Sequence, residues 1–417
     1  MIPEEVLADT VRGEWGRLIA LLLRQFRRLD LAEDALADAV ESAARTWPGA
    51  GAPDRPAAWL LTAARRRVID RLRAEAMAAR RAPLVGADEE SRRRGGGGGA
   101  MADPGDLVED DLLRLVLMCC HPSLTPEVAS ALALRLVVGT STADIARLFL
   151  VPEPTMAARI TRGKKKIVAA GVPFAVPDAT ALPLRLSVVA QTAYLAFTAG
   201  YAPGSGDRLV RSDLAGEAIR LVRVTLGLRP DEPVLRSLLA LMLLQHSRRD
   251  ARVDGAGALV LLPDQDRSSW HHEEIEEALD LLRRLPPDPE SLAESYRLQA
   301  LIAAEHAIAR TASDTRWDRI CDGYAALLAV SPTPAARLAL AVAVSERDGP
   351  EAGLRALAGL EREMPASHRM PAVRAELLVR AGRGVEATKA YDRAIALCGN
   401  AVEREHLTSR RDEIAGH

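Results

Sequence analysis

The chain has 417 residues, a formal net charge of −2 and 48% hydrophobic residues, enough for two or three domains with substantial cores. Aromatic residues make up only 3%, and the abundance of Ala and Leu favours helix over sheet, so we expect an all-α fold. No run approaches the roughly 18 uncharged apolar residues of a membrane span. The first residues also lack the pattern of a secretory signal, so the sequence predicts a cytoplasmic protein without a membrane partner.

The first informative helix is predicted over residues 31–44, LAEDALADAVESAA. Asp34, Asp38 and Glu41 follow one another at steps of four and three residues, which places their carboxylates on one helix face. Such an acidic stripe suits a basic partner surface. The alternative is a face that is only solvated.

Residues 58–73 predict a second helix with one apolar face and one arginine-rich face. Trp59 stands at its start, and Trp47 lies just upstream. Aromatic rings stack on bases while guanidinium groups follow phosphates, so this pattern suits single-stranded DNA. A core tryptophan on an amphipathic helix is the alternative. The arginine-rich face holds Arg65, Arg66, Arg67, Arg71 and Arg73.

A flexible linker is predicted over residues 81–106, where five consecutive glycines form residues 95–99. Residues 92–94 are three arginines, which either touch nucleic acid or simply keep the tether solvated.

The four cysteines do not form a disulfide framework in a chain of this length. Cys119, Cys120 and His121 are adjacent, whereas tetrahedral metal sites use spaced ligands. We therefore expect buried thiols, with no metal and no cofactor. Cys321 and Cys398 are expected to be isolated core residues.

Residues 139–168, GTSTADIARLFLVPEPTMAARITRGKKKIV, predict two helices separated by a turn. Ser141 or Thr142 is the expected N-cap of the first helix. The dipeptide Val151–Pro152 ends that helix, because a residue before proline avoids helical geometry. The second helix is expected to start near Pro154, which suits a first helical position.

The second helix of this pair has five basic side chains and no acidic one from Thr155 to Ala170. We expect Ala157, Ile160 and Ile167 to pack inward, and Met156, Arg159 and residues 164–166 to face solvent. A helix with this local charge suits the major groove of duplex DNA. The alternative is an ordinary helix pair with a solvated basic end. The net charge of −2 is no objection, since local charge sets phosphate affinity.

With these motifs in place, residues 10–170 resemble bacterial sigma factors of the extracytoplasmic-function type. The resemblance implies region 2 over residues 1–80 and a helix-turn-helix region 4 over residues 107–173. The implied partners are promoter DNA and core RNA polymerase, through its clamp coiled coil and its flap. Asp34, Asp38 and Glu41 would bind the polymerase.

The same resemblance assigns DNA contacts residue by residue. The residues implied at the −10 element are Trp59, Arg65, Arg66, Arg67 and Arg71. The residues implied at the −35 element are Thr155, Met156, Arg159 and Arg162, with Lys164, Lys165 and Lys166 on phosphates. Arg66 stands where many members of the family carry Asn.

The rest of the chain resembles a subgroup with a long C-terminal extension of tetratricopeptide-like helices, through stretches such as YLAFTAGY at residues 194–201. We expect a helical domain over residues 183–285 and tetratricopeptide-like helical pairs over residues 286–417. Tyr324, Ala356 and Tyr391 are separated by 32 and 35 residues, near the ~34-residue period of such repeats.

A polar cluster follows a short apolar run at residues 258–262 and consists of Asp264, Asp266, Arg267 and Trp270. A catalytic site would need a nucleophile or base partner, which the segment lacks. We expect a structural ion-pair network in which Arg267 neutralises its acidic neighbours. A regulatory interface or a small-ligand role is the alternative.

The sequence therefore predicts a sigma factor that directs promoter-specific transcription, with a fused extension that contacts and regulates its sigma domains. Its mechanism would be binding rather than enzymatic catalysis. A helix-turn-helix regulator with a repeat-type sensor, acting without polymerase exchange, is the main alternative. An enzyme centred on residues 264–270 is a second one.

Overall fold

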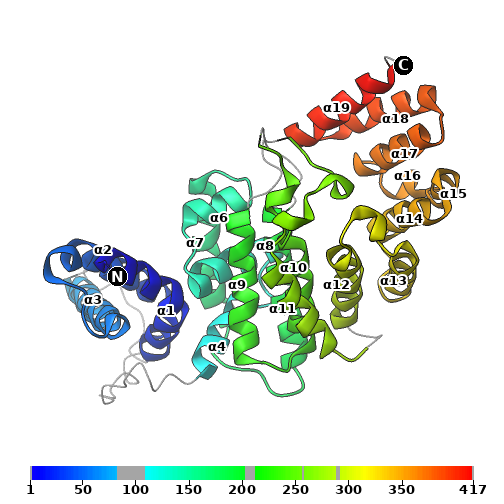
Figure 1. The fold of residues 1–417 in the computed structure, drawn as a ribbon. Coiled ribbons are helices and arrows are strands. Elements are labelled where there is room, and N and C mark those ends of the chain that lie inside the picture. Colours follow the sequence, from blue (N-terminus) through cyan, green and yellow to red (C-terminus); the bar gives the residue numbers. More distant parts are fainter. Residues whose placement is uncertain (1, 82–108, 202–211, 256–257, 288–291, 416–417) are drawn as a thin grey trace. The chain divides into compact units, whose positions relative to one another are not determined.

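The computed structural model describes residues 2–81, 109–201, 212–255, 258–287 and 292–415 (Figure 1). Over these residues the regular structure is helical, and an isolated bridge between Val253 and Leu259 is the nearest approach to a strand. The all-α prediction is thus confirmed. The predicted linker lies, beyond residue 81, outside the described part. None of the described helices combines the length and the apolar character needed to cross a membrane.

The chain divides into two compact units. The N-terminal unit comprises Met1–Ile145 and Glu153–Arg185, and the C-terminal unit comprises Ala146–Pro152 and Leu186–His417. Each is described below by itself.

Three long helices open the N-terminal unit: α1 (Pro3–Phe26), α2 (Leu29–Ala50) and α3 (Pro56–Arg81). Pro3 stands in the first turn of α1, where its missing N–H costs nothing. The three helices pack on one another around side chains that are at most 1% exposed, which include Leu18, Ile19, Leu22, Leu36 and Leu60. The helices predicted over residues 31–44 and 58–73 lie within α2 and α3.

The N-terminal unit continues with α4 (Glu109–Cys119), α5 (Pro126–Ala133), a π-helical segment (Leu134–Val138) and α7 (Glu153–Ala169). The winding is α-helical to Ala133 and widens from Leu134 onward. The indole N–H of Trp15 on α1 donates to the carbonyl of Arg135 in the wide turn at 3.0 Å. Cys119 and Cys120 are fully buried thiols, as expected.

Helix α6 (Thr142–Leu148) precedes α7 along the chain. Ser141, rather than Thr142, is its N-cap, since its Oγ accepts the backbone N–H of Asp144 at 3.0 Å. The helix ends before the expected break, because Leu150 takes a left-handed conformation with φ 55°.

The first half of the C-terminal unit surrounds one apolar helix, α10. Eleven of the fourteen residues of α10 are buried, and it contacts α9, α11 and α12. A helix that is buried on nearly all sides forms the centre of a core rather than its edge. The helices here are α8 (Leu182–Tyr201), α9 (Ser212–Leu228), α10 (Pro233–His246), α11 (His272–Arg283) and α12 (Leu292–Ile308).

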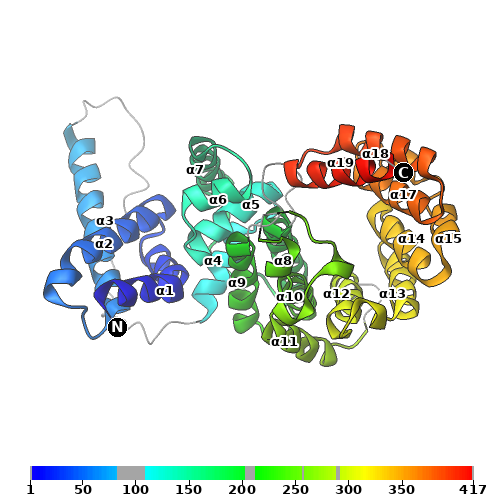
Figure 2. The ribbon, with the colours of Figure 1, turned by 45° about the horizontal axis from the view of Figure 1, so that its top comes forward.

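The second half of the unit is a row of short helices in which chain neighbours pack together (Figure 2). Three small cores follow in order, and the positions that the predicted period singles out fall one in each: Tyr324, Ala356 and Tyr391. Residues 350–363 form two short helices, with Gly359 at φ 86° before the second. The helices are α13 (Trp317–Val330), α14 (Pro334–Asp348), α15 (Pro350–Ala356), α16 (Leu360–Glu363), α17 (Arg369–Arg380), α18 (Gly384–Leu397) and α19 (Ala401–Ala415).

Candidate nucleic-acid interface

Helix α7 has one buried face and one basic face. Its buried residues are Met156, Ile160, Gly163 and Ile167, at steps of four, three and four. At about 100° per residue these steps keep them on a single side of the helix. Gly163 lets α7 approach α5 closely, because a Cβ there would lie 2.7 Å from Val128 Cγ1. The buried side thus fixes which side of α7 meets solvent.

Roughly a quarter turn away lies a polar stripe formed by Thr155, Arg159, Arg162 and Lys166. Arg159 is half-buried and the other three side chains are exposed. Lys165 is exposed beside the stripe. None of these four cations has an ion-pair partner among the described residues, so this side of α7 presents unneutralised positive charge.

Met156 does not belong to this stripe, which corrects the prediction. Its side chain is fully buried, whereas the sequence predicts a solvent-facing base reader. Ala157 is the converse case: it is predicted to pack inward and is exposed. Both errors have one cause: the buried face of α7 includes Met156 together with Ile160, whereas the prediction places Ala157 on that face.

Lys164 is also removed from the phosphate-facing set. It forms an ion pair with the carboxylate of Glu33, a residue of α2 with a 7% exposed side chain. The guanidinium of Arg135 donates to the same carboxylate at 2.6 Å. One buried acid and two cations therefore join α2, the π-helical segment and α7. Glu33 is not among the site residues predicted from the sequence; the available signal is a carboxylate among the apolar positions of α2.

Residues predicted to bind the polymerase and residues predicted to bind the −10 element contact one another. Arg71 of α3 contacts Asp38 at 2.8 Å and Asp34 at 3.3 Å, and Arg67 approaches Asp38 at 3.8 Å. Glu41 pairs with Arg45 on its own helix at 3.4 Å. These pairs are half-exposed or exposed, so each contributes at most about 1 kcal/mol to stability.

The two tryptophans of the region interact with each other. Trp47 is 3% exposed and meets Trp59 edge to face, with ring centroids 5.5 Å apart. Trp47 is thus a core residue, while Trp59 stays half-buried at the surface.

Arg65 and Arg66, the first two arginines after Trp59 along α3, differ in their surroundings. Arg66 is exposed and has no ion-pair partner among the described residues. Burial lowers the pKa of Arg65, whose Nε has no hydrogen-bond acceptor in the described part of the chain. Arg66 is therefore the cation of α3 best placed to meet an external anion.

The polar cluster at residues 264–270 is built differently from the prediction. Arg267 forms no ion pair with Asp264 or Asp266; it donates to the carbonyls of His306 and Ala309 at the end of α12, and to Ala309 at 3.1 Å. Its guanidinium also lies over the Trp270 ring, 4.9 Å from the centroid. Asp266 instead accepts the backbone N–H of Ser268 at 2.9 Å and begins a short helical turn. The cation therefore satisfies the C-terminal carbonyls of a helix, a role that favours positive charge.

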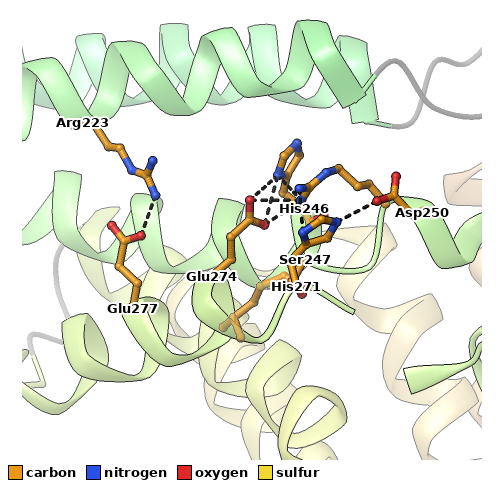
Figure 3. Close-up of polar contacts among 9 residues, drawn as sticks. Arg223, His246, Ser247, Asp250, His271, Glu274 and Glu277 are labelled. Carbon is orange, nitrogen blue, oxygen red and sulfur yellow. Dashed lines mark hydrogen bonds and ion pairs between the residues drawn. The ribbon is translucent and has the colours of Figure 1, made fainter. Parts of the chain in front are cut away.

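A second polar network, which the sequence does not predict, joins the two ends of the connection between α10 and α11 (Figure 3). Glu274 of α11 accepts from Arg249 at 2.9 Å and lies 3.0 Å from His246 Nδ1. His271 contacts Asp250 at 2.7 Å and donates its backbone N–H to Ser247. Burial opposes ionisation of Glu274, but His246 and the nearby cations outweigh it and lower its pKa. The network ties the end of α10 to the start of α11.

Cys398 is a buried free thiol, as expected, but polar side chains lie close to it. Its thiol, His368 and Glu403 bring three possible metal-ligand atoms within 4.8 Å of one another. His368 already pairs with Glu403 at 2.9 Å, and the thiol donates to the Asn400 carbonyl at 3.4 Å. These contacts account for all three side chains without an ion.

Comparison with known proteins supports a transcriptional role for the N-terminal unit. Residues 114–167 match the family model "Sigma-70, region 4", which spans α5, α6 and most of α7, and residues 185–285 match a family of unknown function (DUF6596). An uncharacterized protein of Rhizobium meliloti (strain 1021) is 42% identical over 400 residues, which cover 94% of this chain and 92% of that protein. The region 4 match indicates a DNA-binding, transcription-factor-like protein rather than an enzyme. The chain therefore belongs to the same family as the Rhizobium meliloti protein, and its region 4 domain supports a sigma-70 family factor.

Proposed function

We propose that this protein is a sigma factor of the extracytoplasmic-function type, which binds core RNA polymerase and directs transcription from its own promoters. The observation that carries the proposal is the unneutralised basic stripe of α7 inside the region 4 match. A region 4 helix needs such a stripe to contact promoter phosphates and bases.

In this proposal Thr155, Arg159 and Arg162 lie in the major groove of the −35 element, and Lys165 and Lys166 lie against phosphates. The N-terminal turns of a recognition helix are the part that reaches base edges. Arginine in this position can donate two hydrogen bonds to guanine.

The first three helices would serve the polymerase and the −10 strand. Trp59 and Arg66 offer an aromatic ring and an unpaired cation for an unstacked base and its phosphate. Asp34 and Asp38 would exchange Arg71 for a basic polymerase surface. The exchange costs little, because exposed ion pairs contribute at most about 1 kcal/mol.

The C-terminal unit would regulate the sigma domains as a tetratricopeptide-like extension. The succession of three small cores supports this, since stacked repeats bury their apolar faces between neighbours. Residues Ala146–Pro152 group with that unit. A Cβ at Gly200 would lie 3.0 Å from Leu148 Cδ1 and 2.9 Å from the Ala215 nitrogen, so α8 approaches both residues closely.

The proposal is tested by run-off transcription from a pool of genomic promoters with core RNA polymerase and the full-length protein. We expect promoter-specific transcripts that Arg162→Glu reduces at least about tenfold, because the charge reversal places a carboxylate against DNA. Arg283→Glu on α11 is the matched control: its side chain is 73% exposed, and the change should leave transcription unaltered. Tight duplex binding without polymerase, and no transcript with it, would favour the helix-turn-helix regulator instead.

The regulatory part has its own matched pair of variants. Gly200→Ala adds a methyl group against Ala215 and Leu148, whereas Gly216→Ala on α9 meets nothing within 4 Å. We expect Gly200→Ala to change the transcript yield severalfold and Gly216→Ala to leave it unchanged. Equal yields from the two folded variants would contradict regulation through this contact.

A further inference from the structure

The C-terminal unit contains a cavity of about 490 Å³ that none of the functions above uses. Its walls come from the end of α10, the segment Leu262–Trp270, α12, α13 and the start of α14. A volume of this size lies within the range of pockets that hold small organic ligands, about 300–1,000 Å³.

The lining of the cavity carries a formal positive charge. Arg248 supplies it, whereas no Asp or Glu of the described chain contributes to the walls. Arg267 lies directly behind, bonded to the carbonyl of His306. Burial, followed by the charges of Arg248 and Arg267, lowers the pKa of His306 to about 4, so the imidazole is neutral near pH 7 beside these two arginines. Asp314, which acts electrostatically on Arg267, is outside the lining.

The start of α14 adds to the positive potential. Thr333, Ala335 and Ala336 line the cavity, and Thr333 is the N-cap of this 15-residue helix. Thr333 Oγ1 accepts the Ala336 N–H at 3.2 Å. The first turn of a helix carries partial positive charge and unpaired N–H groups, which favours an anion nearby.

The remaining walls suit an apolar body with hydrogen-bonding edges. Trp270 is only 4% exposed, and its indole N–H has no acceptor among the described residues. Tyr324 and Ile302 supply further apolar surface. The amide of Gln299 is oriented by Ser295, whose carbonyl accepts its N–H at 3.1 Å. Buried polar groups normally find partners, so the unsatisfied indole N–H beside the cavity points to a bound molecule.

We infer that this cavity binds a small organic monocarboxylate, with the carboxylate toward Arg248 and the start of α14 and the apolar body against Trp270 and Tyr324. A planar guanidinium matches a carboxylate geometrically. One lining arginine suits a single negative charge better than the double charge of a phosphate monoester. The inference concerns ligand binding alone, and it stands whether or not the chain is a sigma factor.

Calorimetric titration of the full-length protein tests the inference with phenylacetate, phenylbutyrate and octanoate, each beside its neutral amide. We expect at least one acid to bind with a stoichiometry near one and at least about ten times more tightly than its amide, as charge-assisted hydrogen bonds require. Absence of saturable binding by all three acids would overturn the inference, as would equal binding of acids and amides.

Variants locate the binding. Arg248→Gln should bring acid and amide within about twofold, while Arg248→Lys should retain most of the preference. Arg316→Gln is the control, because this arginine is 54% exposed, pairs with Glu305 and lies outside the lining. Circular dichroism and the melting temperature establish that each variant is folded. A preference unchanged in folded Arg248→Gln would overturn the site, and tighter binding of phenyl phosphate than of the acids would overturn the choice of head group.

Discussion

Helices α3 and α7 carry similar sets of basic side chains but lie beside different neighbours. α3 packs on α2, whose Asp34 and Asp38 pair with Arg67 and Arg71. α7 packs on α5, where the residues that face Gly163 are the apolar Val128 and Leu132. Four of the five cations of α7 therefore have no ion-pair partner among the described residues, Lys164 being the exception. Of the five arginines on the basic face of α3, two pair with α2 and Arg73 pairs with Asp70 on its own helix. The charge that each helix presents to a ligand therefore depends on the neighbouring helix and not on the count of basic residues.

Within α7, neighbouring lysines also differ in whether an acid lies beside them. Lys164 lies on the side of the helix that meets Glu33 and is 17% exposed, whereas Lys165 and Lys166 point to solvent. A difference of one residue rotates a side chain by about 100°, enough to move it from an ion pair to open solvent.

The largest expected effect comes from removing the acid of that ion pair. Glu33→Gln leaves Arg135 and Lys164, with side chains 19% and 17% exposed, without their carboxylate. We expect the free energy of unfolding of the N-terminal unit to fall by about 3 kcal/mol, as for other broken buried pairs. Urea denaturation followed by circular dichroism measures it. Glu41→Gln is the control, since its side chain is 67% exposed, and a similar loss in that variant would contradict the buried role of Glu33.

In the C-terminal unit, the buried imidazole of His306 lies beside two arginines. His306 has its pKa lowered to about 4, by burial and then by Arg248 and Arg267. The unfolded chain therefore takes up a proton near pH 6.5 that the folded chain refuses until about pH 4, so stability is full above pH 6.5 and lost as the pH falls through this window. We expect a loss of about 2–3 kcal/mol. Urea denaturation at several pH values should show a shallower pH dependence in His306→Gln; an identical one would contradict the assignment.

A smaller effect is expected on DNA binding, in which Lys164 and Lys166 should contribute differently to the salt dependence. Lys166→Gln should lower the slope of log affinity against log salt for duplex promoter DNA by about 0.9, and Lys164→Gln should leave it nearly unchanged. Between 50 and 200 mM salt this corresponds to about a threefold difference in affinity. Fluorescence anisotropy with full-length protein and core polymerase measures both slopes, and equal slopes would show that the Glu33 pair opens on binding.

The smallest effect distinguishes two arginines of α3. Arg66→Gln should weaken binding of a single-stranded −10 oligonucleotide by the polymerase complex two- to threefold, because Arg66 is exposed and unpaired. Arg71→Gln should instead cost up to about 1 kcal/mol of stability through its partners Asp34 and Asp38. An oligonucleotide titration and urea denaturation of both variants measure these two quantities. Equal affinities together with equal stabilities in the two variants would contradict the prediction.

Much of the local structure follows from the sequence because it depends on near neighbours. Ser141 caps α6, a turn precedes Pro152, and helices occupy the predicted segments of α2 and α3. The errors are of another kind. The sequence places Met156 on the wrong face, because the phase of α7 depends on how closely Gly163 approaches α5. The sequence also predicts that Arg267 pairs with its acidic sequence neighbours, whereas its partners lie about forty residues away.

The sequence by itself determined the all-α class, the order of the helices and the positions of the basic segments. These depend on apolar periodicity, capping and proline, which act within a few residues. Only the tertiary structure decided which cations stay unpaired, that Glu33 gathers Arg135 and Lys164, and that distant segments enclose a cavity beside Arg248. Those outcomes require groups separated by tens to more than a hundred residues to meet. A charged side chain then interacts with the charges that packing brings close to it.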